Sequence, residues 1–298
     1  MNILMTGGTG LIGSEFIRQY SRDHEFTVVS RNVASAQSKL GNHVNVVENV
    51  SSIENFESFD AIINLAGEPI ADKRWTDTQK RTICDSRWDI TSALVSKINS
   101  CNTPPPVFLS GSAIGFYGNQ KDKVVTEDTS PHIEFTHELC AKWEAIAQSV
   151  DQTKTRVVTL RTGVVLSEKG GALGKMALPF KLGVGGTLGS GSQYLAWIHL
   201  QDMVRAIAFL LEKEACSGAF NLTAPAPVTN KVFSKALAKS LGRLCLFNVP
   251  SFLMKVAMGE SSTMILEGQR VIPEKLTSSG FTFEYPAIDD ALSDIYSA

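Results

Sequence analysis

The chain has 298 residues, 43% of them hydrophobic and 19% charged, with a formal net charge of −2 at pH 7. Its length fits one large domain or two small ones, and its composition is that of an ordinary globular protein. The near-neutral charge excludes the strongly basic balance of a nucleic-acid-binding protein, so we expect no nucleic acid partner.

Signals for targeting, membrane insertion and metal binding are missing from the sequence. No apolar run approaches the roughly 18 residues of a membrane helix, and the N-terminus carries no secretory leader. The five cysteines are scattered without a CxxC spacing, and the five histidines form no HExxH motif. These features favour a cytoplasmic protein with reduced thiols, no membrane partner and no metal.

The first thirty-one residues are predicted to form a strand, a glycine turn, a helix and a second strand. A glycine triplet between a strand and a helix is typical of dinucleotide binding. Gly7 would permit a tight turn, and Gly10 would let a pyrophosphate approach the backbone. Gly13 would let the helix pack closely on the strand. The free N–H groups at the start of this helix would bind the phosphates. The alternative is a plain glycine turn in an α/β protein. We predict cofactor contacts from Gly7, Thr9, Gly10, Leu11, Ile12 and Gly13.

The end of the second strand indicates which nucleotide is bound. A fold that binds NAD usually has Asp or Glu there for the ribose 2′-hydroxyl, whereas this chain has Ser30, Arg31 and Asn32. A planar, permanently charged guanidinium suits a 2′-phosphate. Ser30 and Arg31 therefore predict NADP(H) rather than NAD(H). The alternative is that Arg31 is a solvated surface arginine.

Apolar runs alternate with helical patterns through the first half of the chain. This alternation predicts an α/β fold with a doubly wound parallel sheet, whose ligands bind beyond the carboxyl ends of the strands. That rule places 7–13, Arg31, 65–68, 110–117 and 161–165 around one crevice. Further strands are expected at 44–47, 60–65, 107–110 and 156–160, with helices at about 75–100 and 135–150.

The second half of the chain changes character. Residues 170–191 are rich in glycine but too apolar for a disordered linker. We interpret them as a flexible flap over the crevice with a short helix, or as a long structural loop. Elements are then expected at 202–211 (helix), 219–223 (strand), 232–241 (helix) and 252–258 (helix), followed by a tail that mixes turns with a last helix.

Several motifs together resemble the extended, epimerase-like branch of the short-chain dehydrogenase/reductase superfamily. They are the glycine turn, Asn64-Leu65-Ala66-Gly67, Ser110-Gly111-Ser112 and Phe116-Tyr117-Gly118. More closely, the chain is similar to the atypical epimerase-family proteins, a group that includes the YfcH-like bacterial proteins. The closer match is carried by Lys73-Arg74-Trp75, Ser86-Arg87, Gly115-Phe116-Tyr117-Gly118, Thr126-Glu127-Asp128, Arg161-Thr162-Gly163-Val164-Val165-Leu166, Trp197-Ile198-His199 and residues 266–273.

The resemblance implies an NADP(H)-binding Rossmann core over 1–165, to which about 196–228 return. A smaller substrate-side lobe would comprise 166–195 and 229–298, of which 249–298 look like a DUF1731-type module. Dimers are common in the superfamily, so the resemblance admits a homodimer. Further cofactor contacts are expected from Leu65, Ala66, Gly67, Glu68, Arg87, Ser110, Lys142, Arg161, Val164 and Val165.

The usual catalytic machinery of the superfamily is incomplete in this chain. It consists of a Ser or Thr, a Tyr and a Lys, with the last two in a YxxxK spacing on one helix face. Ser112 aligns with the serine and Lys142 with the lysine, but the tyrosine position holds Glu138. A glutamate has a resting pKa of about 4.3, which a neighbouring lysine lowers further. Glu138 and Lys142 are therefore either catalytic substitutes or a surface ion pair, and the proton donor stays unassigned.

Three other residues are candidates for the site. Tyr117 is either a proton donor or a packed structural residue. His199 titrates in a useful range but also suits a structural role. Arg87 would bind an anionic group bidentately unless it forms a surface ion pair. Lys73 and Arg74 would add a cationic rim to the pocket, or form a solvated face.

Two classes of function follow. The first is an NADP(H)-dependent oxidoreductase or epimerase-like enzyme, in which the nicotinamide carries the hydride chemistry and Arg87 and Lys73 favour a small, polar, anionic substrate. The second is a non-catalytic NADP(H)-binding redox sensor or scaffold, which the missing tyrosine motivates. A nucleotide-sugar epimerase would need a pocket for UDP or a similar carrier, and the sequence shows no sign of one.

Overall fold

A seven-stranded parallel sheet forms the centre of the computed structural model, which describes residues 1–297. Its strand order is β12-β7-β5-β4-β1-β2-β3, so the chain winds outward from β1 in both directions. The predicted doubly wound parallel sheet is thus confirmed, and its switch point lies between β1 and β4. The strands are β1 (Asn2–Thr6), β2 (Glu25–Val29), β3 (Asn45–Val47), β4 (Ala61–Asn64), β5 (Val107–Ala113), β7 (Arg156–Thr162) and β12 (Gly218–Leu222).

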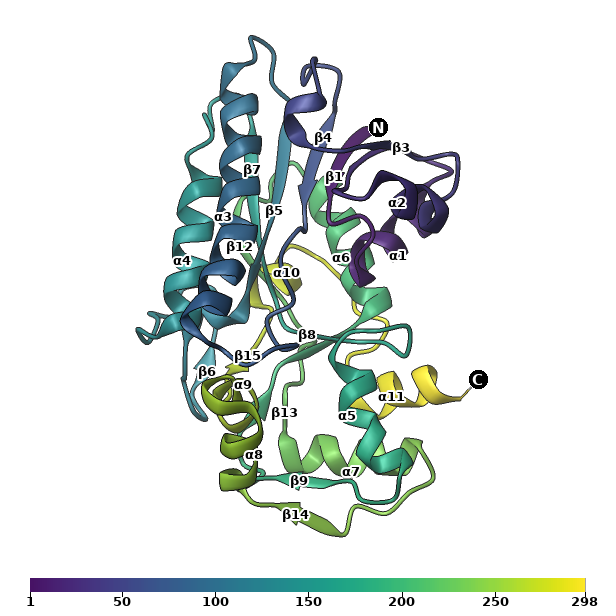
Figure 1. Ribbon diagram of the computed structural model, residues 1–298, viewed down its shortest axis with the longest axis vertical. Coiled ribbons are helices and arrows are strands. Elements are labelled where there is room, and N and C mark those ends of the chain that lie inside the picture. Colours follow the sequence, from purple (N-terminus) through teal and green to yellow (C-terminus); the bar gives the residue numbers. More distant parts are fainter. Residues whose placement is uncertain (298) are drawn as a thin grey trace.

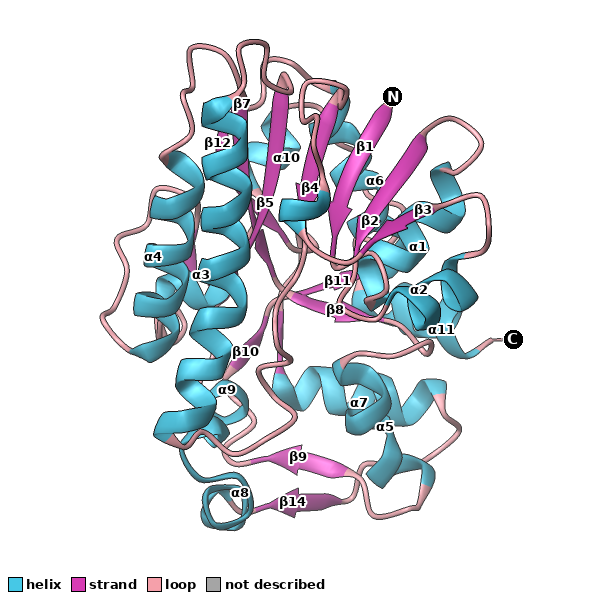
Figure 2. Cartoon of the chain, turned by 45° about the horizontal axis from the view of Figure 1, so that its top comes forward, coloured by secondary structure: helices cyan, strands magenta, loops and turns pink. Residues whose placement is uncertain are grey.

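The central strands read as unbroken apolar runs because helices cover both faces of the sheet. Ile3 and Met5 face one apolar cluster, which includes α1 and α6, whereas Leu4 faces another cluster beneath α3 and α4. Figure 2 shows α3 and α4 together on one face of the sheet. The covering helices are α1 (Leu11–Tyr20), α2 (Val33–Leu40), α3 (Asp77–Ser100), α4 (Phe135–Gln148) and α6 (Leu200–Glu212).

A smaller lobe lies beyond the carboxyl ends of the strands (Figure 1). It has its own apolar core, in which Trp197 and Phe233 are almost fully buried. Its elements are α5 (Ala172–Lys181), β9 (Gly186–Leu188), β10 (Tyr194–Leu195), β13 (Val228–Thr229), α7 (Asn230–Ser240), β14 (Phe247–Val249), α8 (Ser251–Met258), η3 (Gly259–Ser262), α9 (Thr263–Leu266) and α11 (Ile288–Tyr296).

The glycine-rich segment is more ordered than a flap. Leu173, Ala177 and Phe180 of α5 are buried in the core of the lobe, and β9 pairs with β14 in parallel. Three of its apolar residues are therefore core residues of a helix, whereas Leu178, Leu182 and Val184 are exposed. The other predicted elements are present, with ends that agree or differ by up to three residues: the helix expected from 75 begins at Asp77, and the strand expected to 160 ends at Thr162.

Short elements join the lobe to the sheet. The carboxylate of Glu127 is buried and accepts hydrogen bonds from the backbone N–H groups of Asn221 and Lys275, which ties the C-terminal segment to β12. No helix in the described part of the chain is both long and apolar enough to cross a membrane. The joining elements are η1 (Val50–Ser52), η2 (Ile114–Tyr117), β6 (Val124–Val125), β8 (Val164–Leu166), β11 (Trp197–His199), β15 (Arg270–Val271) and α10 (Glu274–Ser278).

Candidate functional site

The glycine turn lies at the switch point of the sheet, with each glycine in a different environment. Gly7 has a φ of 70°, and a Cβ there would lie 2.6 Å from the backbone of Leu65. A Cβ on Gly13 would lie 2.5 Å from the carbonyl oxygen of Gly7, so only glycine lets α1 pack this closely. Gly10 is exposed, and α1 begins after it without a side-chain cap. The first N–H groups of α1 are therefore open to an anion.

Hydrogen bonds hold the end of β4 against this turn. The hydroxyl of Thr6 donates to the side-chain oxygen of Asn64 at 2.6 Å and accepts from the N–H of Ala66 at 3.3 Å. The side-chain amide of Asn64 in turn donates to Thr91 on α3, at 2.8 Å. The residues after β4 and those after β1 therefore lie side by side, on one side of the crevice that the sequence predicts.

Two cations lie along the outer side of the turn. Arg31 is exposed shortly after β2. The pKa of Glu68 is lowered mainly by the hydrogen bond from Lys73, and the charge of Arg31 contributes to the same lowering. Lys39, in the last turn of α2, donates to the carbonyl oxygen of Thr9 at 2.7 Å. Sequence reasoning missed Lys39 because nothing in its helical context distinguishes it from a solvated lysine.

Arg87 projects from α3 against the backbone after β4. Its guanidinium donates to the carbonyl oxygens of Ile83 and Glu68 at 2.9 and 3.0 Å and lies 5.4 Å from the ring centroid of Trp143. A Cβ on Gly67 would lie 2.9 Å from the guanidinium carbon, so glycine makes the contact possible. Burial lowers the pKa of Arg87. No ion pair with a carboxylate is found for it among residues 1–297, which leaves its charge available to an anion.

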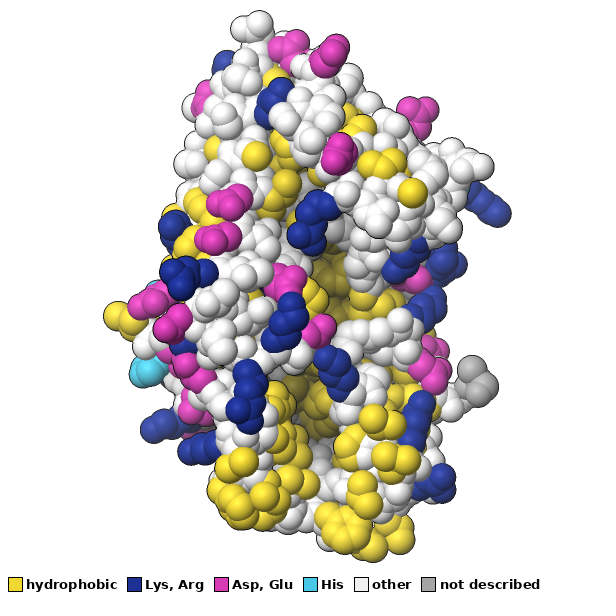
Figure 3. Space-filling view, viewed as in Figure 1, with side chains coloured by type: hydrophobic (Ala, Val, Ile, Leu, Met, Phe, Trp, Pro, Cys, Tyr) yellow, Lys and Arg dark blue, Asp and Glu magenta, His cyan; other side chains and the backbone are white. Residues whose placement is uncertain are grey.

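The expected cationic rim is mostly engaged within the protein. Lys73 pairs with Glu68 at 2.9 Å. Arg74 donates to the carbonyl oxygens of Val256 and Ala257 at the end of α8, which links the loop before α3 to the lobe. Figure 3 shows lysine and arginine side chains along the hollow that separates the sheet domain from this lobe.

A buried network occupies the other side of the crevice, where β5, β7 and α4 meet. Ser112 donates to a carboxylate oxygen of Glu144 at 2.6 Å, and Arg161 binds both oxygens of that carboxylate at 2.8 and 2.9 Å. Arg161 also donates to the hydroxyl of Tyr117, which itself donates to Asn221 at 2.6 Å. Burial works against the charge of Arg161, but its hydrogen bonds to Glu144 raise its pKa overall.

The hydroxyl groups of Tyr117 and Ser112 are therefore hydrogen-bonded to other protein groups. Tyr117 is 0% exposed, and burial raises its pKa to about 12. A hydroxyl that is bonded on both sides and retains its proton this strongly is a poor proton donor to a substrate. Ser110 is also fully buried, within 3.5 Å of the Asn64 amide.

The register of α4 differs from the one that the YxxxK comparison assumes. Glu138 and Lys142 are exposed, and the ammonium of Lys142 lies 3.9 Å from the centroid of the Trp88 ring. The helix instead buries Cys140 and Glu144 against β5. Two residues rotate a helix by about 200°, so the pair chosen from the sequence lies on the outer face. We correct that placement: Glu138 and Lys142 do not lie beside Ser112.

The inward positions with the same four-residue spacing are Thr136 and Cys140. A Cβ on Gly115 would lie 3.1 Å from the Cβ of Thr136, which places this side chain against the segment after β5. The thiol of Cys140 is buried, and burial raises its pKa to about 12. A tyrosine and lysine working from α4 would need these two positions, and neither residue here can replace them chemically.

His199 lies away from the crevice in a structural position. It caps α6, where its Nδ1 accepts from the N–H of Gln201 at 3.2 Å, and its ring centroid lies 4.0 Å from that of Tyr285. Its Nε2 is 3.4 Å from a carboxylate oxygen of Asp294 on α11. Burial lowers the pKa of His199. Its contacts join the C-terminal helix to the core.

Val164 and Val165 of β8 are half-buried, Val164 against the core of the lobe and Val165 against the cluster that also contacts Leu11. A Cβ on Gly171 would lie 3.0 Å from Leu11 and 3.7 Å from the carbonyl oxygen of Val165, so the segment before α5 borders the start of α1.

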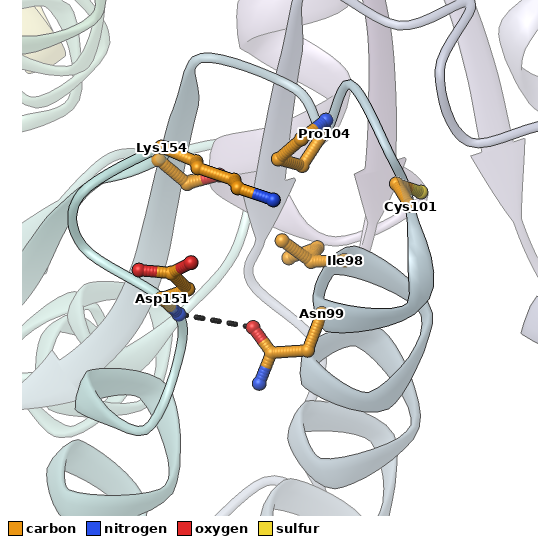
Figure 4. Close-up of a pocket in the computed structure, with 7 residues that line it drawn as sticks. Ile98, Asn99, Cys101, Pro104, Asp151 and Lys154 are labelled. Atoms are coloured by element: carbon orange, nitrogen blue, oxygen red, sulfur yellow. Dashed lines mark hydrogen bonds between the residues drawn. The ribbon is translucent and has the colours of Figure 1, made fainter.

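A small pocket lies at the opposite edge of the sheet, where the N–H of Asp151 donates to Asn99 at 2.9 Å (Figure 4). Ligands of doubly wound sheets bind at the carboxyl edge, so we assign no function to this pocket.

Comparison with known proteins gives consistent matches over the whole chain. Residues 3–223 match the family model described as the NAD dependent epimerase/dehydratase family, and residues 249–295 match a domain of unknown function, DUF1731. An epimerase family protein of Staphylococcus aureus (strain MRSA252) is 38% identical over 297 residues, which cover 99% of this chain and 98% of that protein.

Two solved structures are similar. The human epimerase family protein SDR39U1 (isoform 2) with NADPH is 34% identical, with a TM-score of 0.91 over 100% of this chain and 99% of that one. A nucleoside-diphosphate sugar epimerase from Corynebacterium glutamicum is 25% identical, with a TM-score of 0.79 over 99% of this chain and 58% of that one.

Proposed function

The chain belongs to the NAD-dependent epimerase/dehydratase family, and we propose that it is an NADP(H)-dependent oxidoreductase or epimerase-like enzyme acting on a small, polar, anionic substrate. The observation that carries this proposal is the open side of the crevice. There the uncapped start of α1, the exposed Arg31 and the guanidinium of Arg87, which has no carboxylate partner in the described chain, surround the switch point of the sheet. A cofactor with three phosphates and an anionic substrate would supply the missing negative charge.

The residues at this site fit NADP(H). Gly10 leaves the backbone accessible, and no carboxylate follows β2 to repel a 2′-phosphate. In the proposed complex, the turn binds the pyrophosphate while Arg31 and Ser30 hold the 2′-phosphate, with Lys39 adding a second cation. The structural relative named above was solved with NADPH, which supports the same preference. The proposed contacts that complete the cofactor site are Leu65, Ala66, Gly67, Glu68, Val164 and Val165.

The cofactor would supply hydride transfer at the nicotinamide, and the protein would supply binding and orientation. Arg87 would hold the substrate anion close to the backbone of Gly67. Ser112, Tyr117 and Arg161 would shape the inner wall through the buried network rather than exchange protons. In this proposal, the proton that accompanies hydride transfer comes from solvent, since the nearby buried groups are already paired.

Hydride transfer from NADPH to matched carbonyl compounds tests the proposal. We expect 2-oxo acids to be reduced with a higher kcat/KM than their uncharged amides. Arg87→Gln should lower kcat/KM for the acids by about 10-fold or more while leaving the amides little changed, because only the acids lose a charge-assisted hydrogen bond. The exposed Arg81→Gln on the same helix is the matched control. Equal losses for acids and amides would contradict an anion site at Arg87.

The second candidate function is a non-catalytic NADP(H)-binding redox sensor or scaffold. It is favoured by the buried network, in which Ser112 and Tyr117 are both bonded to protein groups. The two functions differ in a single measurement. Tight NADPH binding by calorimetry, with no oxidation of NADPH by any compound in a panel of carbonyls and quinones, would favour the sensor.

A further inference from the structure

The lobe carries most of the large hydrophobic side chains that are exposed in the described chain. Eleven of the fifteen large hydrophobic side chains that are exposed in the described chain fall within residues 178–264, less than a third of its length. Scattered single hydrophobic residues are normal on a protein surface, but a concentration of them marks an interaction site. Six of them are 59–74% exposed: Leu182, Val184, Leu244, Leu246, Phe252 and Val256.

These side chains belong to segments that meet at the far end of the lobe, which we call the lobe tip. It comprises the exposed face of α7, the strand β14, the helix α8 and the loops that follow α5 and α7. Figure 1 places these elements at the end of the molecule opposite the amino edge of the sheet, and Figure 3 shows apolar side chains gathered there. The helix α8 has the sequence SFLMKVAM and no fully buried residue, and its Phe252, Leu253 and Val256 side chains are exposed.

The charge around the tip is mostly positive, although Lys175 and Lys181 pair with Asp72 and Glu168 and the exposed Glu260 follows α8. Residues 171–199 and 225–259 contain seven Lys or Arg and no Asp or Glu, and all seven are exposed. Since the whole chain has a net charge of −2, the remaining residues carry −9. Five of the seven form no ion pair within the described chain: Lys231, Lys235, Lys239, Arg243 and Lys255.

We propose that the lobe tip docks on a membrane surface that contains anionic phospholipid. Exposed leucine and phenylalanine side chains would enter the boundary between headgroups and acyl chains, while the cations bind lipid phosphates. A second copy of the chain is a poorer occupant, because two tips facing each other would oppose five unpaired positive charges to five. The membrane partner was not expected from the sequence because the tip is assembled from separate segments and therefore contains no long apolar run.

Vesicle flotation with the full chain tests this proposal. We expect the protein to float with vesicles of phosphatidylcholine and phosphatidylglycerol in equal parts, and to bind far more weakly to phosphatidylcholine alone. Each cation near an anionic surface contributes roughly fivefold in affinity, so Lys235→Glu with Lys239→Glu should weaken binding by more than an order of magnitude. High salt should weaken the binding of the wild-type chain in the same direction.

A second set of substitutions tests whether apolar side chains of the tip enter the membrane. Leu246→Glu with Phe252→Glu should abolish flotation, whereas Ile133→Glu, at a side chain that is 75% exposed outside the tip, should not change it. Unchanged melting temperatures would show that all three variants fold. Failure of the wild-type chain to float with anionic vesicles at low salt overturns the proposal. So does a concentration-dependent oligomer that the tip variants dissociate while no vesicle binding is seen, since a second copy would then cover the tip.

Discussion

The polar groups on the two sides of the crevice differ in whether they have hydrogen-bonding and ionic partners within the protein. On the side of β1, β2 and β4, backbone N–H groups and two guanidinium groups have no acidic partner in the described chain. On the side of β5, β7 and α4, hydroxyls, a carboxylate and a guanidinium are buried and bonded to one another. Polar groups left open at one side are suited to a ligand, whereas those on the other side stabilise the fold. The open side is thus suited to the proposed cofactor, whereas the side of β5, β7 and α4 has its polar groups closed off by one another.

The largest expected effect tests the closed side. Arg161→Met would leave the carboxylate of Glu144 buried without its partner, since both residues are less than 10% exposed. We expect the free energy of unfolding to fall by about 3–5 kcal/mol, measured by urea denaturation. Glu138→Gln, at an exposed position of the same helix, should change it by no more than about 0.5 kcal/mol. Similar stability of the two variants would break the comparison, because the network would then not hold the fold.

The open side is tested by cofactor selectivity. Arg31→Asp should weaken NADPH binding by roughly 2–3 kcal/mol and NADH binding much less, because only NADPH carries the 2′-phosphate. Calorimetric titration with both nucleotides measures the difference. Arg22→Asp, at an exposed residue after α1, is the matched control. Equal losses for NADPH and NADH would contradict the assignment of the 2′-phosphate to Arg31.

Two glycines of the same turn sharpen the distinction between binding and folding. Gly13→Ala would force a Cβ to 2.5 Å from the Gly7 carbonyl oxygen and should destabilise the protein by about 1–3 kcal/mol. Gly10→Ala meets only one neighbour, at 3.2 Å, and should keep its melting temperature while losing NADPH affinity. Loss of stability in both variants, with NADPH affinity retained by Gly10→Ala, would show that the turn serves only the fold.

The smallest effect concerns the pH dependence of the closed side. Burial raises the pKa of Tyr117 to about 12, whereas an unfolded tyrosine titrates at about 10. The folded state therefore keeps a proton that the unfolded state loses, and the stabilisation, complete below about pH 10, is lost as pH rises towards 12. Between pH 10 and 12, the free energy of unfolding should fall less for Tyr117→Phe than for the wild-type chain, as measured by denaturant unfolding at each pH. An unchanged decline would mean that other groups cause it.

Motifs that act through nearby residues could be predicted well. The glycine turn, the alternation of strands and helices, and Arg31 after β2 follow from local patterns, because strand, turn and helix occur within thirty residues. The register of α4 could not be obtained in this way. Spacing identifies Glu138 and Lys142 as a pair on one face, but it does not say which face is buried. That choice depends on how Cys140 and Glu144 pack against β5, which lies more than twenty residues earlier in the chain.

The sequence by itself determined the doubly wound sheet, the open turn at its switch point and the absence of a carboxylate after β2, because each depends on residues that are close in the chain. Only the tertiary structure decided that Ser112 and Tyr117 are bonded to Glu144 and Asn221, and that the apolar segments of the lobe meet in one cationic tip. Hydrogen bonds and surface patches of this kind join residues many positions apart, and their partners are selected by packing rather than by spacing.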